Sequence, residues 1–348
     1  DELRAQGKAV VGPGADGARL EGSKAYMKEF LAAAGVPTAR FDVVTDAPGA
    51  LASLRAMSPP YVVKTDGLAA GKGVLVTNDL DDAVLDASAK LAGAAFGDAG
   101  RTVVIEEGLS GEECSLLVLC DGRDAVALAP AQDYKRVGDA DTGANTGGMG
   151  AYAPMATLPA GLVDAVMGGV VAPTLRELTR RGVDYRGVLY AGLMLTDAGP
   201  SLLEYNVRFG DPEAQVVAPL YGADLYDLLA ATATGELAGV GCAPAGAAVT
   251  VVLASRGYPE SPTGGDVITG LGDDGQLAAP RDGVIVFHAG TRLERGRFVT
   301  TGGRALSVTA IAGTVEDARR SAYDAVATVT FGGMVVRGDV ARAQRGGK

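Results

Sequence analysis

The stretch LLEYNVRFGDPE, residues 202–213, decides how this chain is expected to fold. Side chains of a β-strand point alternately to its two faces, so the stretch predicts a strand with one apolar and one polar face. The apolar face, which we expect to pack on a core, consists of Leu203, Tyr205, Val207 and Phe209. The polar face consists of Glu204, Asn206 and Arg208.

That polar face combines two oxygen ligands with one guanidinium. A carboxylate and a carboxamide oxygen suit a hard divalent cation, and a guanidinium pairs with phosphoryl oxygens. The pattern predicts a site for a metal-bound polyphosphate on this strand. Taken alone, the triplet is more typical of a half-exposed strand with a surface ion pair, so the prediction depends on the motifs that follow.

A glycine-rich segment follows another expected strand, Pro60–Lys64. Lys64 ends that strand, and Gly71-Lys72-Gly73 lies in a loop that leads into the expected strand Val74–Val76. The loop lacks the GxxxxGK[ST] spacing and the following helix of a P-loop. The backbone N–H groups of such a turn, together with Lys72, can instead cover phosphates. A tight hairpin with solvent-facing lysines is the alternative.

The segment IEEGLSGEE, residues 105–113, ends an expected buried strand with an acidic turn. A hinge of this kind can offer backbone groups to an adenine edge and a carboxylate to ribose hydroxyls. Acidic turns without any ligand are common, so the segment alone decides nothing.

The loop DYKRVGDADTGANTGGMGAY, residues 133–152, is the most specific signal in the chain. It has little regular period, and loops of this length are uncommon unless they are functional or disordered. Basic residues beside acidic ones, with an Asn-Thr-Gly-Gly turn, predict an anion-binding nest. The alternative is a flexible linker, which seldom mixes such residues so densely.

Composition excludes several classes of protein. The 348 residues include 31 Lys+Arg and 42 Asp+Glu, a net charge of −11 that argues against a nucleic-acid-binding protein. The three cysteines have no CxxC spacing, which argues against a disulfide framework or a zinc knuckle. No apolar run reaches the ~20 residues of a membrane helix, and no signal peptide is recognisable, so we expect a cytoplasmic protein.

The rest of the pattern alternates strands and helices. Helices are expected over a segment that ends at Gly35 and over residues 80–96, 161–181, 224–233 and 314–328. Strands are expected over residues 9–11, 102–105, 115–120, 188–195, 248–254, 284–288 and 305–311. Strands followed by a helix after residue 241 predict a small α+β unit.

Together these motifs closely resemble the phosphoribosylamine–glycine ligase (glycinamide ribonucleotide synthetase) family of the ATP-grasp superfamily. The resemblance runs from about Gly12 to Arg337. Besides the 133–152 loop, it is carried by LAAGKG (68–73), IEEGLSGEE, LEYNVRFGDPEAQ (203–215), VFHAG (286–290) and TTGGRALSVTA (300–310).

The resemblance implies a fold of the α+β or α/β class, namely an ATP-grasp fold of two α+β subdomains clasping ATP, with a small C-terminal α+β domain. The expected limits are a remnant of an N-terminal βα domain at 1–15, an ATP-grasp domain at 16–240 with a mobile flap at about 56–118, and a C-terminal domain at 241–348.

The resemblance also implies a ligase that forms a C–N bond in de novo purine biosynthesis. ATP, glycine and 5-phosphoribosylamine would give glycinamide ribonucleotide, ADP and phosphate through a glycyl-phosphate intermediate. Mg²⁺ or Mn²⁺ is the expected metal. The expected partners are these small molecules, without nucleic acid or membrane, and the expected assembly is a monomer or weak dimer.

The family's functional residues carry over onto matching positions. The expected metal ligands are Glu204 and Asn206. The expected nucleotide-binding residues are Lys64, Gly71, Lys72, Gly73, Glu106, Leu109 and Glu113, with Glu106 and Leu109 acting through their backbones and Glu113 on the ribose. The expected catalytic residues are Arg208 on the transferring phosphoryl group, Lys135 and Asp211. The expected substrate-binding residues are Asp141, Asn145, Thr146, Gly147 and Gly148.

The chain departs from the family pattern at several positions. Tyr134 stands at a usual His, Ala140 and Ala144 at a usual Gly and Pro, and Gly108 at a usual bulky residue. The first three are expected to loosen substrate positioning, and Gly108 matters less because hinge contacts are made by backbone. The family's N-terminal domain is represented only by residues 1–15, so we expect the sequence to be part of a longer enzyme.

Two other functions stay open at this point. One is another ATP-grasp carboxylate–amine ligase or carboxylase that acts on a different acid. The other is an ATP-binding module whose catalysis is impaired by the missing domain or by Tyr134. His288, the only histidine, is expected to be packed or hydrogen-bonded rather than a general base, and Cys114 and Cys120 are expected to be small core residues.

Overall fold

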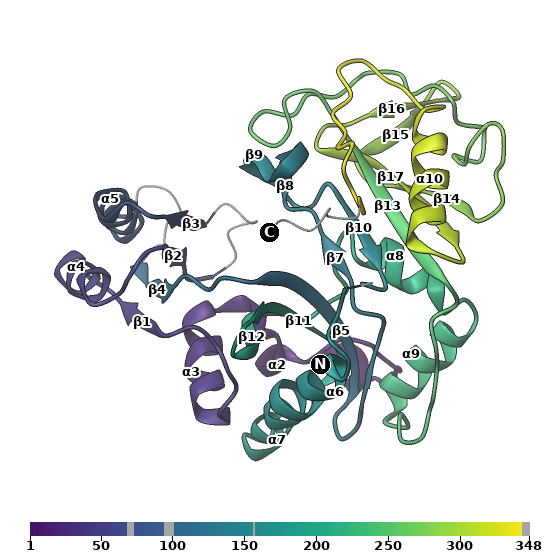
Figure 1. The fold of residues 1–348 in the computed structure, drawn as a ribbon. Helices are drawn as coiled ribbons and strands as arrows, with labels where there is room; N and C mark the ends of the chain where they lie inside the picture. The colour runs from purple at the N-terminus through teal and green to yellow at the C-terminus, as the bar shows by residue number, and fades with distance from the viewer. Residues whose placement is uncertain (68–72, 94–100, 156, 343–348) are drawn as a thin grey trace. The chain divides into compact units, whose positions relative to one another are not determined.

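The computed structural model describes residues 1–67, 73–93, 101–155 and 157–342 (Figure 1). The predicted site residues Gly71 and Lys72 therefore lie outside the described residues. Contacts divide the chain into two compact units. Unit 1 comprises Asp1–Ala127, Pro159–Phe209 and Tyr226–Gly241, and unit 2 comprises Leu128–Leu158, Gly210–Leu225 and Cys242–Lys348.

One sheet of unit 1 is four-stranded and antiparallel, in the order β1-β4-β2-β3. Its strands are β1 (Phe41–Val44), β2 (Tyr61–Thr65), β3 (Val74–Thr77) and β4 (Val103–Glu107). Helices α4 (Ala47–Arg55) and α5 (Leu80–Leu91) pack against it, each begun by an Asp whose side chain caps the first turn (Figure 1). Apolar residues of both helices and of β2 and β4 form one core.

The second sheet of unit 1 is also antiparallel, in the order β12-β11-β5-β6. Its strands are β5 (Glu112–Asp121), β6 (Ala125–Ala127), β11 (Arg186–Thr196) and β12 (Gly199–Asn206). Helices α2 (Ala15–Gly22), α3 (Lys24–Ala34) and α6 (Leu162–Val166) contact β12. A π-helical turn, η3 (Met167–Val171), joins α6 to α7 (Ala172–Arg180); α1 (Glu2–Ala5) and most of α9 (Asp224–Thr234) also belong to this unit.

Unit 2 is built on a five-stranded antiparallel sheet, in the order β14-β17-β13-β10-β7. Its strands are β7 (Gln132–Asp133), β10 (Gly150–Ala153), β13 (Ala247–Ala254), β14 (Val284–His288) and β17 (Arg304–Ala312). Helices α8 (Ala214–Val217) and α10 (Val315–Val326) pack on it. The unit also contains the hairpins β8 (Arg136–Gly138)/β9 (Thr142–Asn145) and β15 (Thr291–Glu294)/β16 (Arg297–Thr300), and the short turns η2 (Asp139–Asp141) and η4 (Ala218–Leu220).

Most expected elements are confirmed, and a few differ from the expectation. The helix before Gly35 is α3, which ends where Gly35 adopts a left-handed conformation. The strand expected at 9–11 does not form, and residues 161–181 are a helix interrupted by the π turn rather than one regular helix. The strand expected over 202–209 ends at Asn206. The 133–152 loop, expected to lack regular structure, is organised by short strands.

Candidate functional site

Glu204 and Asn206 lie two residues apart near the end of β12 and therefore share one face of the strand. The expected alternation is offset by a bulge opposite Gly192 and Leu193, because Gly192 pairs with Glu204 but Leu193 pairs with Leu202. As a result Leu202 rather than Leu203 is fully buried, while Tyr205 is buried as expected. The two predicted metal ligands keep their common face because the bulge comes before them.

Arg208 lies beyond the end of β12, where the chain bends, and its side chain is 56% exposed. Its guanidinium nevertheless contacts the end of β12, where Nη2 donates to Asn206 Oδ1 at 3.2 Å. Its Nε pairs with Glu21 Oε1 at 3.1 Å. The three polar residues expected on one strand face are thus brought together partly by a bend. Glu21, on α2, was not predicted.

A buried ion cluster lies in the same unit. Glu106 Oε2 is 2.8 Å from Lys28 Nζ, and Glu106 Oε1 is 2.8 Å from Lys64 Nζ. Burial lowers the pKa of Lys28 to about 8, against the opposing effect of Glu106. Burial alone would raise the pKa of Glu106, but Lys64 and Lys28 together lower it. The predicted residues Lys64 and Glu106 are therefore direct partners, and Lys28 is a member that the sequence did not reveal.

Lys24 is a second lysine that the sequence reasoning missed. Its Nζ donates to Gly67 O at 3.0 Å, and Asp66 holds the start of α3 through Ser23 Oγ and Ala25 N, both at 3.1 Å. Burial lowers the pKa of Lys24, and Glu204 is the strongest opposing charge. The i, i+4 spacing of Lys24 and Lys28 on a helix that contacts β12 was the signal available in the sequence.

The hinge after β4 is formed mainly by backbone. Gly108 N donates to Pro60 O at 2.9 Å, and a Cβ at position 108 would lie 2.4 Å from that same carbonyl oxygen. This backbone therefore requires the glycine that replaces the family's bulky residue. Leu109 follows half-buried, and Glu113 lies in β5, also half-buried.

The loop 133–152, in unit 2, folds as the β8/β9 hairpin and a tight turn. Thr146 N and Oγ1 both donate to Lys135 O, at 2.8 and 2.9 Å, and Gly148 N donates to Thr146 Oγ1 at 2.9 Å. Gly148 has a φ of +109°, and a Cβ there would lie 2.4 Å from Pro212 Cδ. Asn145 pairs with Arg136 across the hairpin.

Arg304 joins this turn to Asp211. It lies in one of the motifs that carry the family resemblance, but the sequence did not predict a role for it. Its Nη1 donates to Gly147 O at 2.7 Å and to Asp211 O at 2.8 Å, and its Nη2 donates to Asp211 Oδ2 at 3.0 Å. Gln215 Nε2 occupies the other oxygen of Asp211 at 2.8 Å. Three predicted residues, Gly147, Gly148 and Asp211, are thus brought together by an arginine from β17.

Arg337 holds the hairpin from a distant part of the sequence. It is 1% exposed, forms a two-pronged ion pair with Asp339, and donates to Asp141 Oδ1 at 2.8 Å and Arg136 O at 3.0 Å. Its guanidinium lies 4.8 Å from the centroid of the Tyr134 ring. Burial opposes its charge, but the two carboxylates raise the pKa of Arg337 further. Asp141, expected to contact substrate, therefore also has a structural partner.

The expectations for His288, Cys114 and Cys120 are confirmed. His288 Nδ1 lies 2.8 Å from Thr291 Oγ1 and Nε2 lies 2.8 Å from Gly275 O, and the ring packs on Phe298. Both cysteines are buried free thiols on β5. Burial raises the pKa of the Cys114 thiol to about 12, so it is unreactive at neutral pH.

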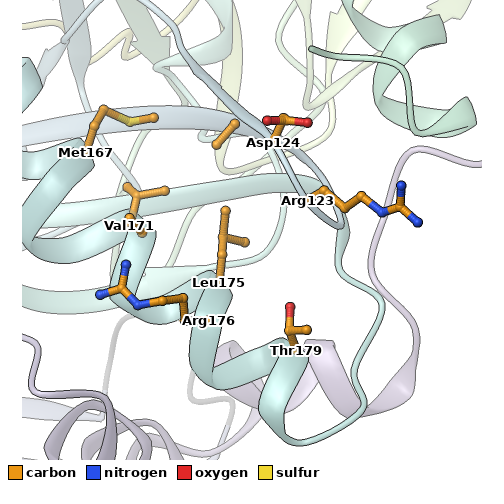
Figure 2. Close-up of a pocket in the computed structure, with 9 residues that line it drawn as sticks. Arg123, Asp124, Met167, Val171, Leu175, Arg176 and Thr179 are labelled. Atoms are coloured by element: carbon orange, nitrogen blue, oxygen red, sulfur yellow. The ribbon is translucent and has the colours of Figure 1, made fainter.

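A cavity of about 500 Å³ lies in unit 1, away from the predicted residues. Figure 2 shows Met167, Val171 and Leu175 along its helical side, with Arg123 and Asp124 from the turn between β5 and β6. None of the predicted site residues lines it.

Two features are absent from the described residues. Among residues 1–67, 73–93, 101–155 and 157–342 there is no group of three or more His, Cys, Asp or Glu side chains that could hold a metal ion. In the same part of the chain, no helix combines the length and apolar character needed to cross a membrane.

Comparison with known proteins gives concordant results. Residues 22–214 match the family model of the phosphoribosylglycinamide synthetase ATP-grasp (A) domain, and residues 248–343 match that of its C domain. The chain is 47% identical to phosphoribosylamine–glycine ligase of Rhizobium meliloti (strain 1021), covering 98% of this chain and 79% of that protein. It is 47% identical to the Streptomyces coelicolor ligase, covering 99% and 81%.

Solved structures agree with the sequence relatives. The crystal structure of phosphoribosylamine–glycine ligase from Thermotoga maritima superimposes with a TM-score of 0.88 at 40% identity, over 95% of this chain and 81% of that one. A biotin carboxylase domain from Hydrogenobacter thermophilus shares the fold, with a TM-score of 0.73 at 18% identity, over 96% and 72%. The chain has the ATP-grasp fold, and it belongs to the phosphoribosylamine–glycine ligase family.

Proposed function

We propose a division of labour among the residues of this chain for the family's reaction, the ATP-dependent joining of glycine to 5-phosphoribosylamine. Glu204 and Asn206 hold a divalent cation, Arg208 and Lys64 pair with phosphoryl oxygens, and Glu106 and Leu109 offer backbone groups to adenine. The observation that carries this proposal is the shared face of Glu204 and Asn206 with the Arg208 guanidinium 3.2 Å from Asn206 Oδ1. Glu113 is proposed to meet the ribose.

The donor set fits magnesium. Mg²⁺ is commonly bound by one or two protein oxygens, with water and phosphate oxygens completing its octahedron. Glu204 and Asn206 supply such a pair, and in the described part of the chain no hydrogen bond engages the Glu204 carboxylate. When bound, the cation neutralises phosphate charge. Mn²⁺ is a second metal that the same oxygens accept.

The reaction needs an activated carboxylate. A carboxylate oxygen of glycine attacks the γ-phosphorus of ATP, and the bond from that phosphorus to the ADP oxygen breaks. This gives glycyl phosphate. The sugar amine then attacks the acyl carbon, a C–N bond forms, phosphate leaves and the amine loses a proton. Arg208 and Lys64 stabilise negative charge in the first step and hold the phosphates in line.

Unit 2 supplies the proposed acceptor residues. Lys135 and Asp211 are the expected catalytic residues there, and Asp141, Asn145, Thr146, Gly147 and Gly148 the substrate-binding ones. The turn at 146–148 is fixed by hydrogen bonds from its backbone N–H groups to Lys135 O, Tyr258 Oη and Thr146 Oγ1. The Asp211 carboxylate is oriented by Arg304 and Gln215. Such fixed dipoles and charges suit a small zwitterion and a sugar phosphate. Monomer or weak dimer is the proposed assembly, and the cytoplasm the proposed location.

Glu204→Gln tests the metal assignment. Removing the negative ligand while keeping the side-chain shape is expected to lower turnover by at least about 100-fold, with little change in stability. Steady-state phosphate release at increasing Mg²⁺ concentration measures it. Glu29→Gln, an exposed residue on α3, removes the same charge from unit 1 and is the matched control. An unchanged rate for Glu204→Gln at saturating Mg²⁺ excludes Glu204 as a metal ligand.

A further inference from the structure

Lys28 is a fully buried cation that has no role in the proposed reaction. Its side chain is 0% exposed, pairs with Glu106 at 2.8 Å and donates to Thr38 Oγ1 at 2.7 Å. Thr38 Oγ1 donates in turn to Leu202 O at 2.7 Å. Burying an ammonium is costly even when it is paired, and an apolar side chain of similar length would fill the same space. A stabilising role alone therefore does not explain a lysine here.

The geometry of Glu106 shows what Lys28 adds. One carboxylate faces two ammonium groups, Lys28 on Oε2 and Lys64 on Oε1, each at 2.8 Å. The three side chains together carry one surplus positive charge. Lys28 is fully enclosed, whereas the Lys64 side chain keeps 9% of its surface. Glu204 and Lys24 are the further charged groups that act on this cluster.

We infer that Lys28 is a positioning residue for the nucleotide: by holding Oε2 of Glu106, it prevents Glu106 from neutralising Lys64. This rests on the proposed role of Lys64 in binding the polyphosphate. With Lys28 in place, Glu106 fixes Lys64 through one oxygen while the surplus charge of the cluster faces the phosphates. Without Lys28, both oxygens of a buried carboxylate are available to Lys64, and a fully paired ammonium binds a phosphate weakly.

Lys28→Met tests the inference through the binding of MgADP, measured by isothermal titration calorimetry. The variant is expected to bind MgADP about tenfold more weakly, the size of effect typical for loss of a charge-assisted contact. The double variant Lys28→Met/Glu106→Gln is expected to bind within about threefold of the parent chain, because a neutral carboxamide at position 106 cannot neutralise Lys64. The substitution leaves the backbone of residue 106, which is its proposed contact with adenine, unchanged.

Lys90→Met is the matched control. Lys90 is also buried, at 3% exposed, and donates to Val63 O at 3.0 Å on the strand that carries Lys64, but its ion-pair partner is Asp86. The Lys90→Met variant removes a buried cation beside β2 without changing the contacts of Glu106. It is expected to leave the affinity for MgADP unchanged. Lys64→Met tests the underlying assumption and is expected to weaken MgADP binding at least as much as Lys28→Met.

The outcomes separate the two proposals. Weak binding by Lys64→Met with parental binding by Lys28→Met overturns the inference and leaves the role of Lys64 standing. Parental binding by Lys64→Met overturns the role of Lys64 itself. If Lys28→Met does not fold, Lys28→Gln, which keeps a donor for Thr38 Oγ1 but removes the charge, carries the test. Weaker MgADP binding than that of the parent chain supports the inference, and parental binding overturns it. Binding by the double variant as weak as that of Lys64→Met shows that restoring the net charge of the cluster does not restore binding, and overturns the inference.

Discussion

At the residue scale, the chain's departures from its family's pattern have local explanations. Tyr134 stands at a usual His, and its hydroxyl accepts a hydrogen bond from Ala341 N at 2.9 Å while its ring faces Arg337. Burial raises the pKa of Tyr134, so it stays neutral at physiological pH. Gly108 fits a hinge in which no side chain has room. Both substitutions are thus accommodated by contacts that the sequence alone does not reveal.

Ala140 is strained in a way that its family's glycine would not be. It adopts φ 56° and ψ 34°, a left-handed conformation that costs a non-glycine residue about 1 kcal/mol or more. Ala140→Gly is therefore expected to raise the free energy of unfolding by about 0.5 kcal/mol, after the entropy cost of glycine is subtracted. Thermal unfolding measures this as a raised midpoint.

The neighbouring Ala144 supplies the control. It lies in the extended strand β9, where glycine brings only its entropy cost, so Ala144→Gly is expected to lower the midpoint. A lowered midpoint for Ala140→Gly as well would show that the left-handed conformation carries no strain.

At the scale of elements, the β8/β9 hairpin is held by side chains distant in sequence. Arg337 contacts it through Asp141 and Arg136 O, and Arg304 ties the following turn to Asp211. The 133–152 loop is rich in glycine and short polar residues, so no periodic pattern of apolar residues predicts its strands. Its conformation depends on these two arginines.

Arg337→Lys tests the contribution of this hairpin. A lysine keeps the charge but cannot form the two-pronged ion pair with Asp339 while also reaching Asp141. The KM for 5-phosphoribosylamine is expected to rise about tenfold through misplaced acceptor residues, with the KM for ATP unchanged. Initial rates with each substrate varied in turn measure both constants.

Arg319→Lys is the control for that variant. Arg319 bonds the same C-terminal segment, at Gly338 O and Val340 O, but makes none of these contacts with the hairpin. An equal effect of Arg319→Lys, or a rise in the KM for ATP instead, contradicts the account of the hairpin.

At the scale of the whole molecule, most helices and strands could be predicted because their apolar residues repeat with a clear period. The 202–213 stretch could be predicted only in part, since a bulge at Leu203 and a bend after Asn206 interrupt the regular alternation. The partners Lys28, Lys24, Arg304 and Arg337 were missed for another reason. Each acts through a residue far away in sequence. The spacing of Lys24 and Lys28 indicates a shared helix face, but only the tertiary fold reveals the partners.

The chain is a ligase of the ATP-grasp superfamily that forms a C–N bond. We expect its turnover to require ATP, glycine and 5-phosphoribosylamine together. Phosphate release should be measured with ATP, Mg²⁺, glycine and freshly generated 5-phosphoribosylamine, omitting each component in turn. Phosphate release is expected only when all are present, with one glycinamide ribonucleotide formed per phosphate. Sustained phosphate release without glycine or without the amine, or product formed from another acid at a comparable rate, would contradict this expectation.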